Sequence, residues 1–271
     1  MRKYDLVCFD MDGVLTTVRS SWAWVHECLG VDSEPNYRAY CNGEIDEDEF
    51  MRRDIALWKG VKPDIKIRDI AVLFRDMPLI DGIQETIASL RDNGIRSVIV
   101  SGGIDLAAKM IAEEFGFDGY VADVICTNED GSLTGEGRKV VDLADKGVSV
   151  PPFIERFGTT KERTASIGNS FTDVKMFEAT GMAIAFNPTD PYAEEAADHV
   201  VRSRNISDVL EYLLDEERFT RRRCRTRSRR SPRRGPGPDK SSCGSSRRRG
   251  LCPWPRPRLS SRGRSLSLWH G

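Results

Sequence analysis

Short apolar runs recur along the first 215 residues, and small or polar residues follow several of them. The runs at residues 4–9, 96–100 and 164–167 have the length and composition of buried strands. Apolar positions at helical spacing follow at residues 104–115 and 174–179. This alternation is typical of an α/β fold, in which helices cover a mostly parallel sheet.

Two carboxylates follow the first run at a spacing of two residues. Asp10 and Asp12 would lie at the carboxyl edge of a parallel sheet, where open α/β folds bind ligands, and Gly13 lets the chain turn away. One acid can attack phosphorus while the other protonates the leaving oxygen, with a divalent cation offsetting charge repulsion. Aspartate and glycine are also ordinary turn residues. Alone, the motif therefore leaves phosphoryl transfer and a plain turn equally open.

A second polar segment, Ser101-Gly102-Gly103, separates a predicted strand from a predicted helix. The hydroxyl of Ser101 and the free N–H groups of Gly102 and Gly103 would bind phosphate oxygens, helped by the positive end of the helix dipole. An ordinary helix N-cap explains the same residues equally well. The segment is therefore a candidate anion site.

A third predicted strand is followed by residues 168–173, which supply oxygen ligands from Asn169 and Asp173. Lys146 precedes this segment along the chain. A lone lysine is usually a solvated surface residue. Lys146 is therefore a candidate site residue only because of its position ahead of the last motif.

In their order along the chain, these segments resemble the motifs of the haloacid dehalogenase superfamily of phosphohydrolases, most closely its phosphoserine phosphatase-like branch. The resemblance covers about residues 1–215. Residues 130–135 look like the hairpin that precedes the lysine motif in that branch, and residues 173–177 look like its final helix. Chance coincidence of turn residues is the alternative explanation.

The resemblance implies a Rossmann-like α/β core, formed by residues 1–15 and 78–217. Residues 16–77 would form a small helical cap that closes over the substrate and excludes water. Three of the five tryptophans of the chain lie in this segment, either as the core of the cap or as part of a substrate pocket. The cap shows helical patterns at residues 20–29, 46–58 and 65–74.

The family's two-step mechanism assigns a role to each motif. Asp10 would attack phosphorus and form an aspartyl-phosphate. Asp12 would donate a proton to the departing oxygen and later take one from the attacking water. Lys146 would neutralise charge shared by phosphate and Asp10, while Ser101 and Gly102 would orient the phosphate oxygens.

Magnesium is the cofactor that the resemblance implies, since it prefers hard oxygen ligands. Asp10, the backbone carbonyl of Asp12, Asn169 and Asp173 would hold the ion. The phosphoserine branch usually begins its last motif with Gly-Asp, whereas this chain has Asn169 after glycine. An amide carbonyl binds magnesium but adds no negative charge. A catalytically silent binding protein is therefore the alternative to a phosphatase.

Dehalogenation is another chemistry of this superfamily and also uses an attacking aspartate. Asp12 argues against it, because a leaving halide needs no proton and the dehalogenases lack an acid at this position. Phosphomonoester hydrolysis is therefore the predicted reaction.

The expected substrate is a small phosphomonoester, with phosphoserine as the leading candidate. The branch usually carries an acid shortly after the second aspartate to meet the substrate's amino group, but Arg19 lies there in this chain. An arginine suits a second phosphate or a carboxylate better. Arg53 would meet the substrate carboxylate, although a one-residue shift in the comparison puts Asp54 there. Another sugar phosphate or organic-acid phosphate therefore fits nearly as well.

The formal net charge of −1 conceals a division at about Arg218. Residues 218–271 hold 17 Arg and one Lys against one acid, a net charge of +17, while residues 1–217 hold 23 basic and 41 acidic residues. This Arg-, Ser- and Pro-rich tail is predicted to be disordered. Three interpretations of the tail are open. It is a reading-frame artefact; it is an electrostatic tether, either to the acidic body or to a membrane; or it is an RNA-binding arm. Nucleic acid is thus a partner only through the tail.

The remaining composition predicts an intracellular protein of the cytoplasm. No apolar run approaches the ~20 residues that cross a bilayer. The seven cysteines are scattered and odd in number, which favours reduced thiols over a disulfide framework. The sequence leaves the oligomeric state undetermined.

Overall fold

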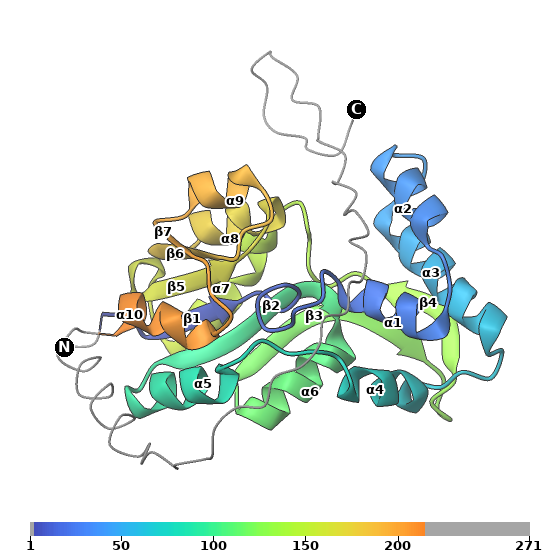
Figure 1. Ribbon diagram of the computed structural model, residues 1–271, viewed down its shortest axis with the longest axis horizontal. Coiled ribbons are helices and arrows are strands. Elements are labelled where there is room, and N and C mark those ends of the chain that lie inside the picture. Colours follow the sequence, from blue (N-terminus) through green and yellow to red (C-terminus); the bar gives the residue numbers. More distant parts are fainter. Residues whose placement is uncertain (1–2, 215–271) are drawn as a thin grey trace, which may run out of the picture.

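The computed structural model describes residues 3–214, which fold around one seven-stranded sheet (Figure 1). The strand order is β4-β3-β2-β1-β5-β6-β7, and only β4 runs antiparallel to its neighbour. The predicted α/β fold with a mostly parallel sheet is confirmed. The strands are β1 (Leu6–Phe9), β2 (Arg96–Ile104), β3 (Gly119–Thr127), β4 (Leu133–Arg138), β5 (Thr164–Gly168), β6 (Met182–Phe186) and β7 (His199–Val201).

Helices cover both faces of the sheet, which is why its central strands read as continuous apolar runs. In β1, Val7 and Phe9 face one hydrophobic cluster, which includes residues of α5, α6 and α10. Leu6 and Cys8 face the other, which is built from α7, α8 and α9. These helices are α5 (Ile83–Asp92), α6 (Asp105–Phe115), α7 (Pro151–Phe157), α8 (Val174–Glu178), α9 (Pro191–Ala196) and α10 (Leu210–Leu213).

The segment between β1 and α5 is helical, as predicted, and gathers at one end of the molecule (Figure 1). Three of its helices match the predicted patterns, but α2 was not predicted. Only Ala39 of α2 is buried, so this helix lacks the periodic apolar positions that indicate a helix in sequence. The helices are α1 (Ser21–Leu29), α2 (Glu34–Cys41), α3 (Glu47–Val61) and α4 (Ile67–Arg75). Their division from the core as a separate cap domain stays a prediction.

The tryptophans of this segment lie in its hydrophobic core or pack against it. Trp58 is fully buried, and Trp22 stacks on it with ring centroids 5.4 Å apart. The Nε1–H of Trp24 donates to the carbonyl oxygen of Leu73 at 3.0 Å, which ties α1 to α4. The packing thus supports a structural role for these tryptophans over a role in a substrate pocket.

A buried polar chain also joins the first three helices. The Nε1–H of Trp58 donates to Nδ1 of His26 at 2.8 Å, so the opposite nitrogen of His26 carries a proton and donates to Asp54 at 3.0 Å. Asn36 donates to the other oxygen of Asp54 at 2.9 Å. Asp54 is 2% exposed, and both of its carboxylate oxygens are already engaged by His26 and Asn36 in this arrangement.

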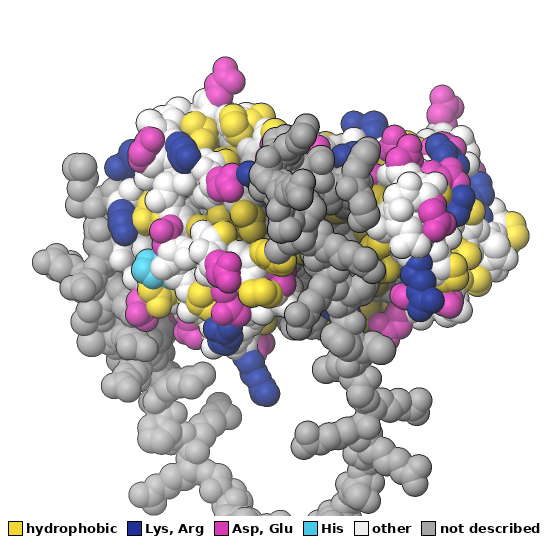
Figure 2. All heavy atoms as spheres, turned by 90° about the horizontal axis from the view of Figure 1, so that it is seen from above, with side chains coloured by type: hydrophobic (Ala, Val, Ile, Leu, Met, Phe, Trp, Pro, Cys, Tyr) yellow, Lys and Arg dark blue, Asp and Glu magenta, His cyan; other side chains and the backbone are white. Residues whose placement is uncertain are grey.

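Helix α3 is fixed to the β4 edge of the sheet by one exposed ion pair and one partly buried hydrogen bond. Arg52 pairs with Glu136 at 3.0 Å, and Nζ of Lys59 donates to the carbonyl oxygen of Leu133 at 2.9 Å. Figure 2 shows acidic and basic side chains interspersed over this end of the molecule.

No helix in residues 3–214 combines the length and apolar character needed to cross a bilayer. The four cysteines in this part of the chain, Cys8, Cys28, Cys41 and Cys126, are free thiols. The tail at residues 218–271 lies outside the described residues, so its three interpretations stay predictions.

Candidate active site

The polar segments predicted to follow three strands do meet at one edge of the sheet. The central strand β1 pairs in parallel with β2 and β5, and Phe9 lies opposite both Ile99 and Ile167. Residues just beyond these positions, including Asp10 and Ser101, therefore emerge side by side. The candidate site is built on rigid strand ends.

Lys146 reaches this edge from a short 3-10 helix, Lys146–Ser149, and is 1% exposed. Its Nζ lies 2.9 Å from Oδ1 of Asp10 and 2.6 Å from Oδ1 of Asp173. Burial lowers the pKa of the ammonium group, but the two carboxylates outweigh this effect and hold the pKa above its usual value. Lys146 is therefore a permanent cation of the site, rather than a solvated surface residue.

Asp10 has one engaged carboxylate oxygen and one unengaged oxygen. Oδ1 accepts the backbone N–H of Met11 at 2.8 Å in addition to Lys146, whereas no residue among 3–214 donates to Oδ2. Burial and then the charge of Asp173 raise the pKa of Asp10 to about 7, against the opposing charge of Lys146. The unengaged Oδ2 is the oxygen available for attack.

Asp12 is held by the first residue of α1. Its Oδ2 accepts the backbone N–H of Ser21 at 2.9 Å and the hydroxyl of Ser21 at 3.0 Å. Its Oδ1 is buried and has no hydrogen-bond partner in the described part of the chain. Burial raises the pKa of Asp12 to about 6, although both bonds from Ser21 favour the ionised form. The group thus suits acid and base chemistry near neutrality.

The Ser101 segment continues β2 rather than forming a separate loop, and the register between β2 and β3 shifts there. The N–H of Gly103 donates to Oγ of Ser101 at 3.1 Å. The expectation that the N–H of Gly103 is free for phosphate is therefore wrong, because Ser101 already binds it. Phosphate binding by the hydroxyl proton of Ser101 and the N–H of Gly102 stays a prediction.

Asp173 organises the last motif from within. Its Oδ2 accepts the N–H groups of Asn169 and Ser170 at 2.8 and 3.1 Å, and its Oδ1 binds Lys146. Gly168 permits this fold of the chain, because a Cβ there would lie 2.4 Å from Cβ of Asp173. Asp173 therefore fixes both the loop and the lysine, and its direct binding of magnesium stays a prediction.

The amide of Asn169 lies against the turn after the aspartates. A Cβ on Gly13 would stand 2.2 Å from Nδ2 of Asn169, and Gly13 has a φ of +76°, so both space and backbone require glycine there. This close approach brings the first and last motifs together.

The donor set fits a hard divalent cation. The site holds three acids, Asp10, Asp12 and Asp173, and the ammonium of Lys146 pairs with Asp10 and Asp173. Within residues 3–214 no group of three or more His, Cys, Asp or Glu side chains is placed to hold a metal. Binding would therefore depend on Asp10 together with neutral oxygens, the amide of Asn169 and the backbone carbonyl of Asp12.

The two arginines proposed to read the substrate occupy different settings. Arg19 is exposed and lies between Asp12 and α1; partial burial lowers the pKa of its guanidinium, while nearby Tyr37 raises it. Arg53 pairs with Glu49 at 2.8 Å on the surface of α3. The roles of Arg19 and Arg53 in reading the substrate both stay predictions.

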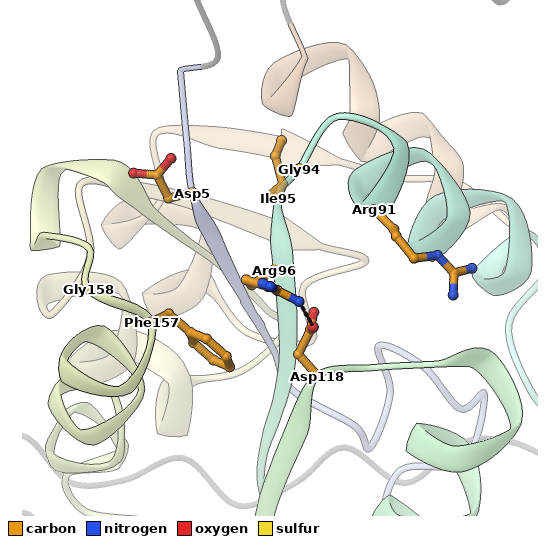
Figure 3. A pocket seen from close by; sticks show the side chains of 8 residues that line it. All are labelled: Asp5, Arg91, Gly94, Ile95, Arg96, Asp118, Phe157 and Gly158. Carbon is orange, nitrogen blue, oxygen red and sulfur yellow. Dashed lines mark hydrogen bonds and ion pairs between the residues drawn. The ribbon is translucent and has the colours of Figure 1, made fainter.

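A cavity of about 420 Å³ lies at the opposite, amino edge of the sheet, lined in part by Asp5, Arg96 and Phe157 (Figure 3). Arg96 pairs with Asp118 at 2.7 Å, and Asp5 pairs with Arg163. None of the predicted catalytic residues lines this cavity.

Comparison with known proteins assigns the class. A family model described as haloacid dehalogenase-like hydrolase matches residues 7–178. Since this match spans more than half of the chain, the protein belongs to the haloacid dehalogenase-like hydrolases.

Relatives define the branch. The phosphoserine phosphatase of Methanocaldococcus jannaschii is 28% identical over 216 residues, which span 78% of this chain and 99% of the relative. That of Halobacterium salinarum is 29% identical over 220 residues, covering 78% and 97% of the two chains. A solved phospho-aspartyl intermediate analogue of phosphoserine phosphatase, 26% identical, superposes with a TM-score of 0.66 over 78% of this chain and all of the other. The predicted branch and the predicted enzyme class are confirmed.

Sequence reasoning missed Ser21, which contacts Asp12 through two atoms. In the sequence, a serine near the start of a helix indicates only a helix cap. Its contact with Asp12, nine residues earlier, is visible only in the folded structure.

Proposed function

We propose that this protein is a magnesium-dependent phosphomonoester hydrolase that acts through an aspartyl-phosphate on Asp10. The arrangement of Asp10 is the observation that carries the proposal. One oxygen is fixed by Lys146 and a backbone N–H, and the other is free of any donor from residues 3–214. A carboxylate held in this way is positioned for in-line attack.

In the first step, Oδ2 of Asp10 attacks phosphorus, and the bond to the alcohol oxygen breaks. Asp12 donates its proton to that oxygen and is left ionised. Lys146 balances the charge shared by Asp10 and the phosphoryl group, while Ser101 and the N–H of Gly102 orient the other phosphoryl oxygens.

In the second step, Asp12 takes a proton from water, which attacks the phosphoryl group and releases Asp10. Bound magnesium supplies further charge neutralisation and orients the phosphate. Asp10, the backbone carbonyl of Asp12 and Asn169 would hold the ion, with Asp173 as a further predicted ligand.

The substrate is proposed to be a small phosphomonoester. Phosphoserine is the leading candidate, since the relatives that match most of this chain are phosphoserine phosphatases. Arg19 favours a substrate with a second anionic group, either a carboxylate or another phosphate. A cytoplasmic location is part of the proposal and rests on sequence composition alone.

The test is magnesium-dependent release of phosphate from a panel of small phosphomonoesters that includes phosphoserine. The wild type is expected to release phosphate, and Asp10→Asn, which keeps the size of the side chain, is expected to be inactive. Circular dichroism of both proteins confirms that they are folded. No release by the wild type at saturating magnesium would reject the proposal and favour a catalytically silent binding protein. The missing negative charge at Asn169 would then be the first cause to test.

A further inference from the structure

Ser21 is the first residue of α1 and is completely buried, although serine usually lies at protein surfaces. Its hydroxyl contacts both Asp12 and the backbone of Ile104, the residue that follows the candidate anion site Ser101-Gly102-Gly103. The Oγ atom lies 3.0 Å from Oδ2 of Asp12 and accepts the backbone N–H of Ile104 at 2.9 Å. One side chain therefore joins α1, Asp12 and the end of β2.

The direction of these hydrogen bonds is determined by the donors. The N–H of Ile104 can only donate, so Oγ of Ser21 accepts it and keeps its own proton for Oδ2 of Asp12. The backbone N–H of Ser21 is one of the unpaired donors at a helix start and also donates to Oδ2, at 2.9 Å. Oδ2 thus accepts two hydrogen bonds and needs no proton of its own.

Oδ1 of Asp12, in contrast to Oδ2, has no hydrogen-bond donor in the described part of the chain. It is buried and receives no hydrogen bond from residues 3–214. A buried oxygen without a partner costs free energy unless a proton or a substrate group meets it. Oδ1 is therefore the carboxylate oxygen of Asp12 that no group of residues 3–214 occupies.

The backbone of Gly103, in the candidate anion site, packs directly on Asp12 and Ser21. A Cβ on Gly103 would lie 2.6 Å from Oδ2 of Asp12 and 2.6 Å from Oγ of Ser21. There is no room for Asp12 to shift toward Gly103, so its carboxylate is held on two sides. The orientation of the acid is thus fixed relative to the groups that bind phosphate.

We infer that Ser21 is a positioning residue for the general acid, holding Oδ2 of Asp12 so that Oδ1 faces the leaving group. This inference rests on the proposed function. Because the hydroxyl comes from α1, the inference also makes the acid step depend on the helical segment that follows the catalytic aspartates.

The test compares two substrates that differ in their need for an acid. An alkyl phosphomonoester needs a proton on its leaving oxygen, whereas p-nitrophenyl phosphate releases a stable anion and does not. The parameter kcat/KM covers the steps up to loss of the leaving group, so hydrolysis of the aspartyl-phosphate does not affect it. In Ser21→Ala, kcat/KM for the alkyl substrate should fall about tenfold or more relative to the aryl substrate.

Two further variants separate positioning from helix stability. Ser20→Ala removes the N-cap of the same helix, whose Oγ accepts the N–H of Ala23 at 3.4 Å, but leaves Ser21 in place. It should leave the ratio of the two kcat/KM values unchanged. Ser21→Thr keeps the hydroxyl and should restore at least part of the ratio. Equal losses on both substrates in Ser21→Ala would overturn the inference.

A crystal structure of Ser21→Ala gives a readout that does not need activity. A rotated or disordered Asp12 carboxylate supports the inference, and an unchanged carboxylate contradicts it. If the wild type releases no phosphate from any substrate, the proposed function fails, and this structural comparison alone decides the role of Ser21.

Discussion

Lys146 lies between two carboxylates in the interior, so replacing it should destabilise the folded protein strongly. In Lys146→Met, Asp10 and Asp173 lose their cation and face each other, and both are at most 5% exposed. Removing one partner of a buried ion pair costs about 3–5 kcal/mol. For a domain of this size, that corresponds to a fall in Tm of about 10 °C.

Asp173→Asn should cost less, because Lys146 keeps Asp10 at 2.9 Å and an amide oxygen can still accept the N–H groups of Asn169 and Ser170. The loss is about 1–3 kcal/mol. In the double variant, Lys146→Met with Asp173→Asn, the carboxylate of Asp173 that would repel Asp10 is gone. Its free energy of unfolding should therefore exceed the additive expectation by about 1–3 kcal/mol.

The assay is urea unfolding followed by tryptophan fluorescence, with EDTA present so that no metal replaces the missing cation. Lys175→Met is the matched control, since Lys175 pairs with Glu178 on the surface of α8 and its removal should leave the unfolding midpoint nearly unchanged. Additivity of the two single variants within about 0.5 kcal/mol would refute the reasoning, because it would show that Lys146 and Asp173 do not interact.

Three other variants test separate parts of the site and its surroundings. Asn169→Asp adds a negative ligand and should tighten magnesium binding about tenfold in calorimetry, whereas unchanged affinity would remove Asn169 from the metal site. Arg19→Ala should raise KM about tenfold for substrates with a second anionic group and leave KM for p-nitrophenyl phosphate unchanged; equal effects on both would exclude the proposed contact. Asp54→Ala leaves His26 and Asn36 without their acceptor and should lower the free energy of unfolding by about 1–3 kcal/mol in urea, and a smaller loss would contradict the importance of this buried chain.

The strand ends and their chemistry could be predicted from the sequence because they depend on local patterns. An apolar run followed by a polar motif places Asp10, Ser101 and Asn169 at one sheet edge in any parallel arrangement. The order of the motifs then identifies the family.

The burial of Lys146 and the role of Ser21 could not be predicted in this way. Nothing in the neighbourhood of Lys146 in the sequence indicates a buried lysine, because its partners Asp10 and Asp173 reach it only through the fold. Ser21 likewise contacts Ile104, which is 83 residues away. The helix α2 escaped prediction for a different reason, since its mostly exposed surface carries no apolar periodicity.

The central claim is that Asp10 carries the phosphoryl group during turnover. The most direct measurement is to quench the wild type with acid during turnover of a phosphomonoester in magnesium, digest it and find the phosphorylated peptide by mass spectrometry. We predict one phosphoryl group on Asp10 of the wild type and none in Asp10→Asn. Phosphate release without a phosphorylated Asp10, together with full turnover by Asp10→Asn, would contradict the account.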